Sequence, residues 1–169
     1  MTPGIALTLL SLGGCVPAGH LTELGAASPI FDPIAFFSGT TRGSASLKIL
    51  TKRRAQITVV GHGTVSASGD IVLEQDVRHA DGRSKHRTWH LRRIGPDRYA
   101  GTLSDAVGPV MGDAVGNRLH LAFAMTGGLK VQQWIYLRPG GQVARNRMVV
   151  SKFGIAVASL DETITRVPE

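Results

Sequence analysis

Cysteine occurs once in these 169 residues, as Cys15, so the chain cannot form an internal disulfide or a zinc site built from several thiolates. Aromatic residues are also scarce, at 5% of the chain. No Gly-x-Ser-x-Gly, His-Glu-x-x-His or phosphate-loop pattern is present, so the common nucleophile and metal templates of enzymes have no candidates. We therefore expect an aliphatic core to hold the fold, and no cofactor.

Glycine, by contrast, is abundant. The 21 glycines are spread along the chain, which suits many short strands joined by tight turns better than long helices. The length fits one domain with a proper hydrophobic core. These two features predict a single all-β domain.

Basic residues outnumber acidic residues, with 19 Lys and Arg against 12 Asp and Glu and a formal net charge of +7. They lie at Arg42 or beyond, scattered at strand-like spacings, with small clusters at Lys52-Arg53-Arg54 and Arg92-Arg93. The sequence contains no recognisable nucleic-acid-binding motif, and the aromatic residues are too few to stack on the bases of a single-stranded nucleic acid. We therefore expect no nucleic acid as a partner. The pattern favours a generic solvated basic surface over a specific anionic partner.

The N-terminal segment is typical of an export signal. Ile5 to Leu12 form an apolar run that is too short to span a bilayer, which needs about 20 residues. Leu12-Gly13-Gly14-Cys15 resembles the bacterial lipobox, whose cysteine is acylated and exposed by cleavage, although Met1 to Gly4 lacks the usual basic residues. We expect a signal peptide over residues 1–14 and a flexible tether over residues 15–29.

Three interpretations of Cys15 stay open. It is a lipid attachment point, a small buried hydrophobe, or a nucleophile, for which only His20 is close by in sequence as a base. We favour lipid attachment, because that chemistry needs no partner thiol and no base. It implies a cell-envelope protein on the periplasm-facing membrane of a Gram-negative bacterium.

Residues 30–169 are predicted to form one β-barrel domain. Asp32 is placed to cap a short helix that begins at Pro33, runs through Phe37 and stops at Gly39. Strands are expected near residues 40–50, 55–66, 70–79, 84–94, 98–105, 108–115, 117–126, 129–138, 142–151 and 154–166. About eight to ten consecutive antiparallel strands favour an up-and-down barrel of lipocalin type, because closure removes exposed sheet edges.

Turn lengths predict which side chains share the lumen. A two-residue loop at Gly127-Gly128 sets Leu121 opposite Trp134, and the following turn sets Asn146 opposite Trp134. This register puts Arg145 and Arg147 outside, and it puts inside Leu119, Leu121, Phe123, Met125, Trp134, Tyr136, Asn146, Met148 and Val150.

A second pair of turns predicts charges in the same lumen. A two-residue loop at Asp81-Gly82 pairs Asp76 with Arg87, and the turn at residues 95–97 pairs Arg87 with Asp105. The same register pairs Glu74 with Trp89. The face so formed holds the apolar residues Val72, Trp89, Leu91 and Leu103 and the charged residues Glu74, Asp76, Arg87 and Asp105. An arginine flanked by carboxylates beside a tryptophan is a candidate ligand site. The alternative is that Arg87 only neutralises the two acids at one barrel end.

Several short segments together resemble one family. They are Phe31-Asp32-Pro33 with Phe36-Phe37, Glu74 with Asp81-Gly82, Arg87-x-Trp89, Tyr99-Ala100-Gly101 with Asp105, Gly116-Asn117, and Asn146-Arg147-Met148 with Lys152-Phe153-Gly154. Over residues 30–167 they are similar in order and spacing to the domain-of-unknown-function family 3833. The resemblance implies a small bacterial lipoprotein with a lipocalin-like barrel and no established catalytic activity. It also implies recurring positions without assigned roles at Glu74, Arg87, Trp89, Asp105, Trp134, Asn146, Arg147 and Lys152, whereas Gln132-Gln133 replaces an acidic pair.

Two functions follow from these expectations. The first is a membrane-tethered binding module whose apolar lumen accepts an acyl chain or another lipophilic molecule, with Arg87 available for an anionic head group. Its candidate ligand-binding residues are Glu74, Arg87, Trp89, Asp105, Phe123, Trp134, Tyr136 and Asn146. The second is a structural or assembly lipoprotein that contacts a protein or an anionic membrane, without a ligand, through an exterior rich in Arg145, Arg147, Lys52 and Arg54.

Catalysis and metal binding are not expected. His86 and His90 share a face of one predicted strand, but they lie too far apart along an extended chain to bind one metal ion. Gly61-His62-Gly63 is interpreted as a strand bend rather than a catalytic turn.

Overall fold

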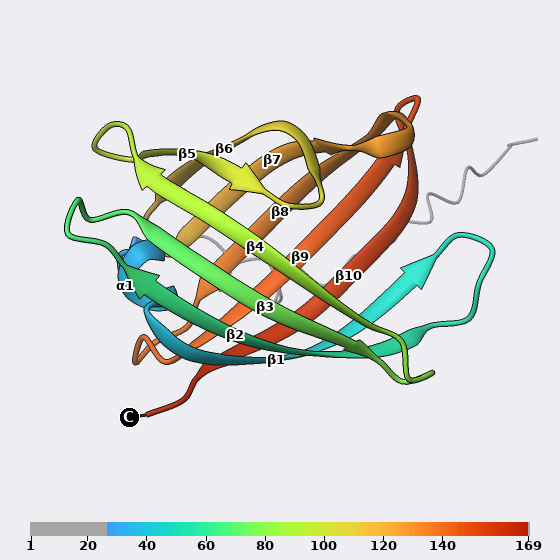
Figure 1. Cartoon of the computed structure of the whole chain (residues 1–169), viewed down its shortest axis with the longest axis horizontal. Coiled ribbons are helices and arrows are strands. Elements are labelled where there is room, and N and C mark those ends of the chain that lie inside the picture. Colours follow the sequence, from blue (N-terminus) through green and yellow to red (C-terminus); the bar gives the residue numbers. More distant parts are fainter. Residues whose placement is uncertain (1–26, 169) are drawn as a thin grey trace, which may run out of the picture.

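The computed structural model describes residues 27–168, which form one short α-helix, a three-residue 3₁₀ turn and ten strands (Figure 1). The helix α1 spans Pro33–Phe37, as predicted. The strands are β1 (Gly39–Ile49), β2 (Ala55–Val65), β3 (Ile71–His79), β4 (Ser84–Arg93), β5 (Arg98–Leu103), β6 (Ala106–Val115), β7 (Arg118–Met125), β8 (Leu129–Leu137), β9 (Val143–Lys152) and β10 (Ile155–Arg166).

The ten strands close into one barrel. Each strand pairs antiparallel with the next strand along the chain, and β1 pairs with β10 to complete the circle (Figure 1). Closure satisfies the backbone hydrogen bonds that an open sheet leaves at its edges. The antiparallel up-and-down barrel of lipocalin-like type is therefore confirmed. None of the helices among residues 27–168 has the length and apolar character needed to cross a bilayer.

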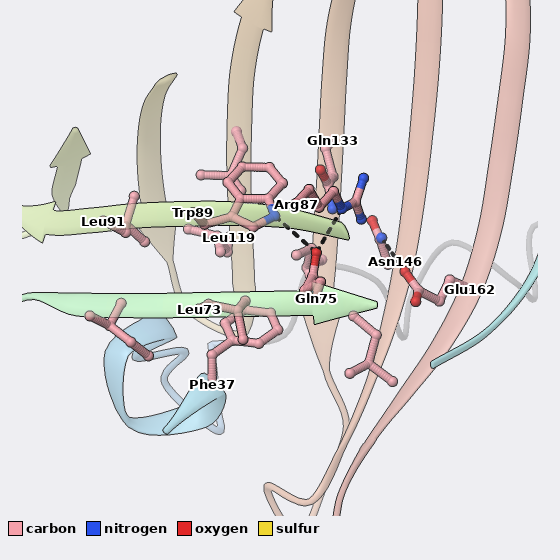
Figure 2. Close-up of a pocket in the computed structure, with 14 residues that line it drawn as sticks. Phe37, Leu73, Gln75, Arg87, Trp89, Leu91, Leu119, Gln133, Asn146 and Glu162 are labelled. Atoms are coloured by element: carbon pink, nitrogen blue, oxygen red, sulfur yellow. Dashed lines mark hydrogen bonds between the residues drawn. The ribbon is translucent and has the colours of Figure 1, made fainter. Parts of the chain in front are cut away.

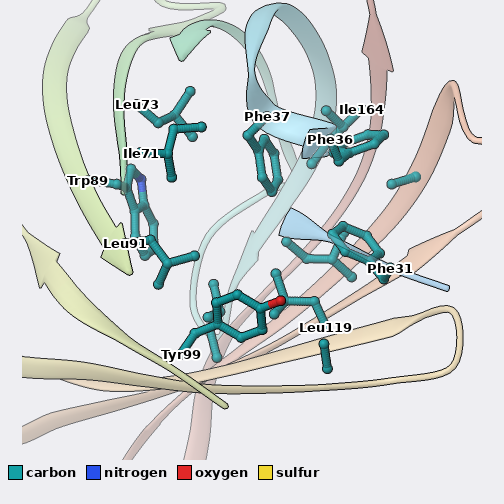
Figure 3. Close-up of a cluster of buried hydrophobic side chains, with 14 of the residues drawn as sticks. Phe31, Phe36, Phe37, Ile71, Leu73, Trp89, Leu91, Tyr99, Leu119 and Ile164 are labelled. Atoms are coloured by element: carbon teal, nitrogen blue, oxygen red, sulfur yellow. The ribbon is translucent and has the colours of Figure 1, made fainter. Parts of the chain in front are cut away.

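One end of the barrel is closed by α1 and the residues before it. The Asp32 carboxylate caps the helix by accepting from the backbone N–H groups of Ile34, at 2.9 Å, and Ala35, at 3.3 Å. Phe31, Phe36 and Phe37 then form an aromatic cluster inside the barrel end, with ring centroids 5.0 to 6.5 Å apart (Figure 3). We call this end the closed end. The turns between β2 and β3, β4 and β5, β6 and β7, and β8 and β9 surround it.

The aromatic cluster packs against the deepest part of the aliphatic core. Tyr99 of β5 and Leu119 of β7 are almost fully buried beside it (Figure 3). The backbone N–H of Phe31 donates to the carbonyl of Gly116, 2.8 Å away, and so ties the entering chain to the β6–β7 turn. The end is thus filled by side chains from outside the sheet as well as from the sheet itself.

Three hairpin turns, β3–β4, β7–β8 and β8–β9, contain one residue more than the sequence analysis assumed. The β3–β4 turn uses three residues, 80–82, with Gly82 in the left-handed region at φ 87°. The predicted pairing of Asp76 with Arg87 is therefore wrong, because Gln75 lies opposite Arg87. Glu74 likewise pairs with Thr88 rather than Trp89. A one-residue shift moves side chains to the other face, so Glu74 and Asp76 point outward.

The β7–β8 turn is the 3₁₀ turn η3 (Thr126–Gly128), in which Gly127 and Gly128 both have positive φ. Leu121 consequently lies opposite Gln133, and Trp134 lies opposite His120. The predicted inward orientation of Trp134 and Tyr136 is wrong. Asn146 pairs with Ile135 rather than Trp134, yet it points inward as expected, because the β8–β9 turn also differs by one residue and the two shifts cancel.

A glycine makes room for the helix at the closed end. A Cβ atom added to Gly63 would collide with the carbonyl oxygen of Phe37. We expect Gly63→Ala to displace α1 and to lower the free energy of unfolding by about 1–3 kcal/mol, the usual cost of overpacking. Chemical denaturation measures this change. Gly95→Ala is the matched control, because a Cβ there meets no atom closer than 3.6 Å; equal effects of the two substitutions would contradict the prediction.

Candidate functional site

The barrel contains a chamber at the end opposite α1, which we call the open end. The β1–β2, β3–β4, β5–β6, β7–β8 and β9–β10 connections surround this end. The chamber has a volume of about 330 Å³ and is lined by Leu47, Ile49, Arg87, Leu103, Asp105, Phe123, Met125, Leu129, Met148, Val150, Val157 and Ala158. Ten of these twelve residues are apolar, and the two charged ones are Arg87 and Asp105. In a site of this kind the few polar groups fix the orientation of a ligand.

A smaller cavity lies between the chamber and the aromatic cluster, and we call it the polar cavity after the five polar side chains among its fourteen lining residues. Its volume is about 40 Å³, and it is lined by Phe37 from α1 together with side chains from the barrel wall. The polar side chains that reach it are Gln75, Arg87, Gln133, Asn146 and Glu162 (Figure 2). Arg87 lines both spaces, so its side chain forms the boundary between the polar cavity and the apolar chamber.

Gln75 fixes the position of Arg87. The Gln75 side-chain oxygen accepts hydrogen bonds from Arg87 Nε and from Trp89 Nε1, each at 2.9 Å (Figure 2). The Arg87 guanidinium also lies 5.8 Å from the centre of the Trp89 ring. One amide oxygen on β3 therefore orients two neighbouring side chains of β4. On the guanidinium, the Gln75 oxygen accepts a hydrogen bond from Nε alone, so the two terminal nitrogens can donate to other acceptors.

The charge of Arg87 is compensated only at a distance. Burial lowers the pKa of Arg87, while the negative charges of Glu162 and Asp105 act in the opposite direction. The guanidinium stays protonated, since its ordinary pKa is far above neutrality. Among residues 27–168 no carboxylate forms an ion pair with Arg87, and Asp105 is paired with Lys85 at 2.9 Å. The lumen thus holds a cation without a directly bound anion.

Glu162 lies on the other side of the polar cavity. Burial raises the pKa of Glu162, against the effects of the Asn146 hydrogen bond and the Arg87 charge. Asn146 donates through Nδ2 to Glu162 Oε2 at 2.7 Å, but its own Oδ1 is buried without a hydrogen-bond partner. Gly43 of the neighbouring strand leaves the space for this carboxylate, because a Cβ there would collide with it.

The structure brings five of the expected site residues to the lumen. Arg87, Asp105 and Phe123 line the chamber, Trp89 and Asn146 line the polar cavity, and Trp89 contacts Phe123 edge-on with ring centroids 5.6 Å apart. Cys15 lies outside the described residues.

Three expected site residues lie on the outer surface. Glu74 is exposed, and Trp134 and Tyr136 point away from the lumen because of the register shift. Trp134 instead stacks on His120, with ring centroids 5.4 Å apart. Asp76, expected beside Arg87, is hydrogen-bonded to His86 at 2.9 Å on the exterior.

Sequence reasoning missed Gln75, Gln133 and Glu162. Each is buried, at 9%, 8% and 7% exposure, and each alternates with apolar inward residues of its strand. A polar residue at an inward position opposite a lumenal arginine is a detectable signal, but only once the register is known. In the described part of the chain, no group of three or more His, Cys, Asp or Glu side chains is placed to hold a metal ion.

The barrel resembles several solved structures in fold. The S-type phycobiliprotein lyase CPES from Guillardia theta matches with a TM-score of 0.65 at 8% identity, over 80% of this chain and 91% of that chain. Rv2717c from M. tuberculosis matches with a TM-score of 0.61 at 14% identity, over 82% and 99%. A protein of unknown function from the DUF3598 family of Nostoc punctiforme matches with a TM-score of 0.60 at 14% identity, over 82% and 50%. At these identities the likeness concerns the fold alone.

Sequence comparison identifies the family. No curated protein matches the chain in sequence. The family described as protein of unknown function, DUF3833, matches residues 9–166, a range that includes α1 and all ten strands. The resemblance inferred from the scattered motifs is thus confirmed, and the chain belongs to the DUF3833 family.

Proposed function

We propose that this protein binds, in its barrel lumen, a lipophilic molecule that carries an acidic group. The observation that carries this proposal is the place of Arg87, a cation without an ion-pair partner in the described chain, at the base of a chamber whose other charged lining residue, Asp105, is paired with Lys85. A charge is costly to keep in such surroundings unless it is compensated. An acidic ligand group would provide that compensation.

The apolar part of the ligand follows from the chamber. Its volume of about 330 Å³ lies within the range of small-molecule sites, roughly 300–1,000 Å³. The lining is aliphatic, with Phe123 as its aromatic member and Met125 and Met148 as flexible ones. Flexible thioether side chains adapt to apolar groups of different shape. The lining therefore supports an alkyl or acyl group rather than a sugar or a nucleotide.

The acidic part of the ligand follows from the electrostatics around Arg87. Lys85 pairs with Asp105, and the raised pKa of Glu162 reduces the tendency of that carboxyl to ionise. Asp105 and Glu162 therefore repel an incoming anion less than two free carboxylates would. The terminal guanidinium nitrogens match a carboxylate or a phosphate in a two-point, charge-assisted hydrogen bond.

The membrane anchor is a separate part of the proposal. Cys15 follows a lipobox-like segment, and acylation there would keep the barrel on the periplasm-facing membrane of a Gram-negative cell envelope. A binding role on a membrane needs no catalytic group, and we propose binding rather than catalysis.

Replacing Arg87 tests the acidic group directly. We expect Arg87→Met to weaken binding of cis-parinaric acid by roughly tenfold to a hundredfold, the range of a lost charge-assisted hydrogen bond. Binding of the methyl ester of the same fatty acid should change little, because the ester has no anion. Fluorescence titration measures both. Arg145→Met on the outer surface is the control, and equal weakening of acid and ester by Arg87→Met would contradict the acidic-group assignment.

Filling the chamber tests the location of the ligand. Ala158 lines the chamber, whereas the next residue of β10, Ser159, faces the other side of the wall. We expect Ala158→Phe to abolish binding of both the acid and the ester, and Ser159→Phe to leave it intact. With Trp134→Phe as background, Trp89 is the single tryptophan, so its emission reports occupancy of the lumen. Unchanged ligand-induced emission in Ala158→Phe would place the ligand elsewhere.

The anchor has its own test. In cells that process bacterial lipoproteins, we expect the full chain to incorporate labelled palmitate and to fractionate with membranes, since acylation with two or more chains is effectively stable. Cys15→Ser should lose the label and should leave lumen binding of cis-parinaric acid unchanged. Labelling of the Cys15→Ser variant would refute the assignment of Cys15.

A further inference from the structure

Three loops at the open end form one continuous arc, which we call the rim arc: residues 48–54, 126–130 and 152–155. They are neighbours because β1 pairs with β10, β10 with β9 and β9 with β8. The backbone N–H of Leu50 donates to the carbonyl of Val157 at 2.9 Å, which joins the first loop to β10. The arc borders the mouth of the chamber, since Ile49 and Leu129 of the arc line the chamber, as does Val157, to which Leu50 is hydrogen-bonded.

The rim arc carries charge of one sign only. Its cations are Lys48, Lys52, Arg53, Arg54, Lys130 and Lys152, and it contains no acidic residue. The two acids elsewhere at this end, Asp81 and Asp105, are paired with Arg83 and Lys85, each at an N–O distance of 2.8 to 2.9 Å. Of the cations expected to make a basic exterior, Arg147 is paired with Asp161 on the barrel wall. The six cations of the rim arc therefore have no acidic residue beside them within the arc, and none of the six forms an ion pair among residues 27–168.

The same arc also exposes large apolar side chains. Phe153 is 90% exposed, Ile155 65% and Leu50 63%. Exposed apolar groups of this size gathered beside cations are typical of segments that rest on a membrane surface, where apolar tips enter the lipid and cations contact anionic head groups.

Phe153 adopts a backbone conformation that is unfavourable for a residue with a side chain. It has φ 50° and is the one non-glycine residue with positive φ among residues 27–168. Lys152 and Ile155 are paired, so Phe153 and Gly154 form a two-residue hairpin turn in which both central residues are left-handed, a turn that strongly prefers Asn-Gly. Among residues 27–168 the aromatic interaction found for this ring is with the Lys152 ammonium, 5.6 Å from its centre. An exposed aromatic in a strained position points to a role outside the fold.

We propose that the rim arc docks on the surface of an anionic lipid bilayer, with Phe153, Ile155 and Leu50 in the interface and the mouth of the chamber facing the lipid. One sign of charge spread over three separate loops matches a uniform anionic surface. A protein partner, by contrast, presents charges of both signs in fixed register. The docking depends neither on Cys15 nor on a ligand in the lumen.

The experiment uses the full chain with Cys15→Ser, which cannot be acylated. Co-sedimentation with sucrose-loaded vesicles should show binding to phosphatidylcholine containing roughly one third phosphatidylglycerol and little binding to pure phosphatidylcholine, because each surface cation adds about fivefold in affinity only on anionic lipid. Binding should fall at high salt. We expect Lys52→Gln combined with Arg53→Gln to weaken binding by roughly 25-fold.

Phe153→Asn separates a membrane role from a structural one. It should weaken vesicle binding by roughly tenfold, because an apolar interfacial group is lost, and raise the melting temperature by a few degrees, because asparagine suits the turn. Two controls lie at the closed end: Val115→Asn, at a residue 60% exposed, and Arg92→Gln combined with Arg98→Gln. They should bind vesicles as the parent does.

Three results would overturn the docking proposal: no binding to anionic vesicles, equal binding to both lipid compositions, or undiminished binding by Phe153→Asn and by the doubly neutralised variant. None of these results bears on ligand binding, which the Arg87 and Ala158 variants test in the absence of vesicles.

Discussion

A closed barrel of ten strands encloses more space than its own inward side chains fill, and this constraint governs the rest of the structure. About eight strands give an interior that side chains just fill. Here the excess is taken up at one end by Phe31, Phe36 and Phe37, which come from a segment outside the sheet. Where that segment does not reach, a chamber of about 330 Å³ is left. The candidate site lies at the open end because the aromatic cluster fills the closed end.

The side chains of the polar cavity, which lies between the aromatic cluster and the chamber, reduce the cost of burying the Arg87 charge without forming an ion pair with it. Gln75 holds Arg87 by a single nitrogen. The Glu162 carboxyl, whose pKa burial raises, acts on Arg87 only from a distance and is bound by Asn146 rather than by Arg87. Gly43 gives that carboxyl its space. A direct ion pair would stabilise the guanidinium better but would occupy the nitrogens that a ligand needs. The separation of the two charges is thus the feature that leaves Arg87 available.

The sequence predicted the elements well and their mutual register poorly, for one physical reason. Alternation and turn residues mark where strands begin and end, and Asp32-Pro33 marks α1, but glycine pairs do not state how many residues a turn uses. Trp89 was correctly set opposite Leu103 across the β4–β5 turn. Across η3 the count was wrong by one, which moved Trp134 from the lumen to the surface. Gln75 and Glu162 were missed because nothing in the chain marks them as inward without that register.

The depth of Arg87 and the exposure of the rim arc are consistent with one direction of ligand entry. A lipid in a bilayer presents its head group to the membrane surface and its tail away from it. In a barrel docked through Phe153, as proposed, the first part of an acidic lipid to cross the mouth would be its head group, which would pass the cations of the rim arc. Arg87 lies beyond the apolar lining, at the base of the chamber. On the proposed function, the acid would therefore reach Arg87 by moving straight inward, and the tail would follow into the aliphatic part of the chamber without the molecule having to turn over.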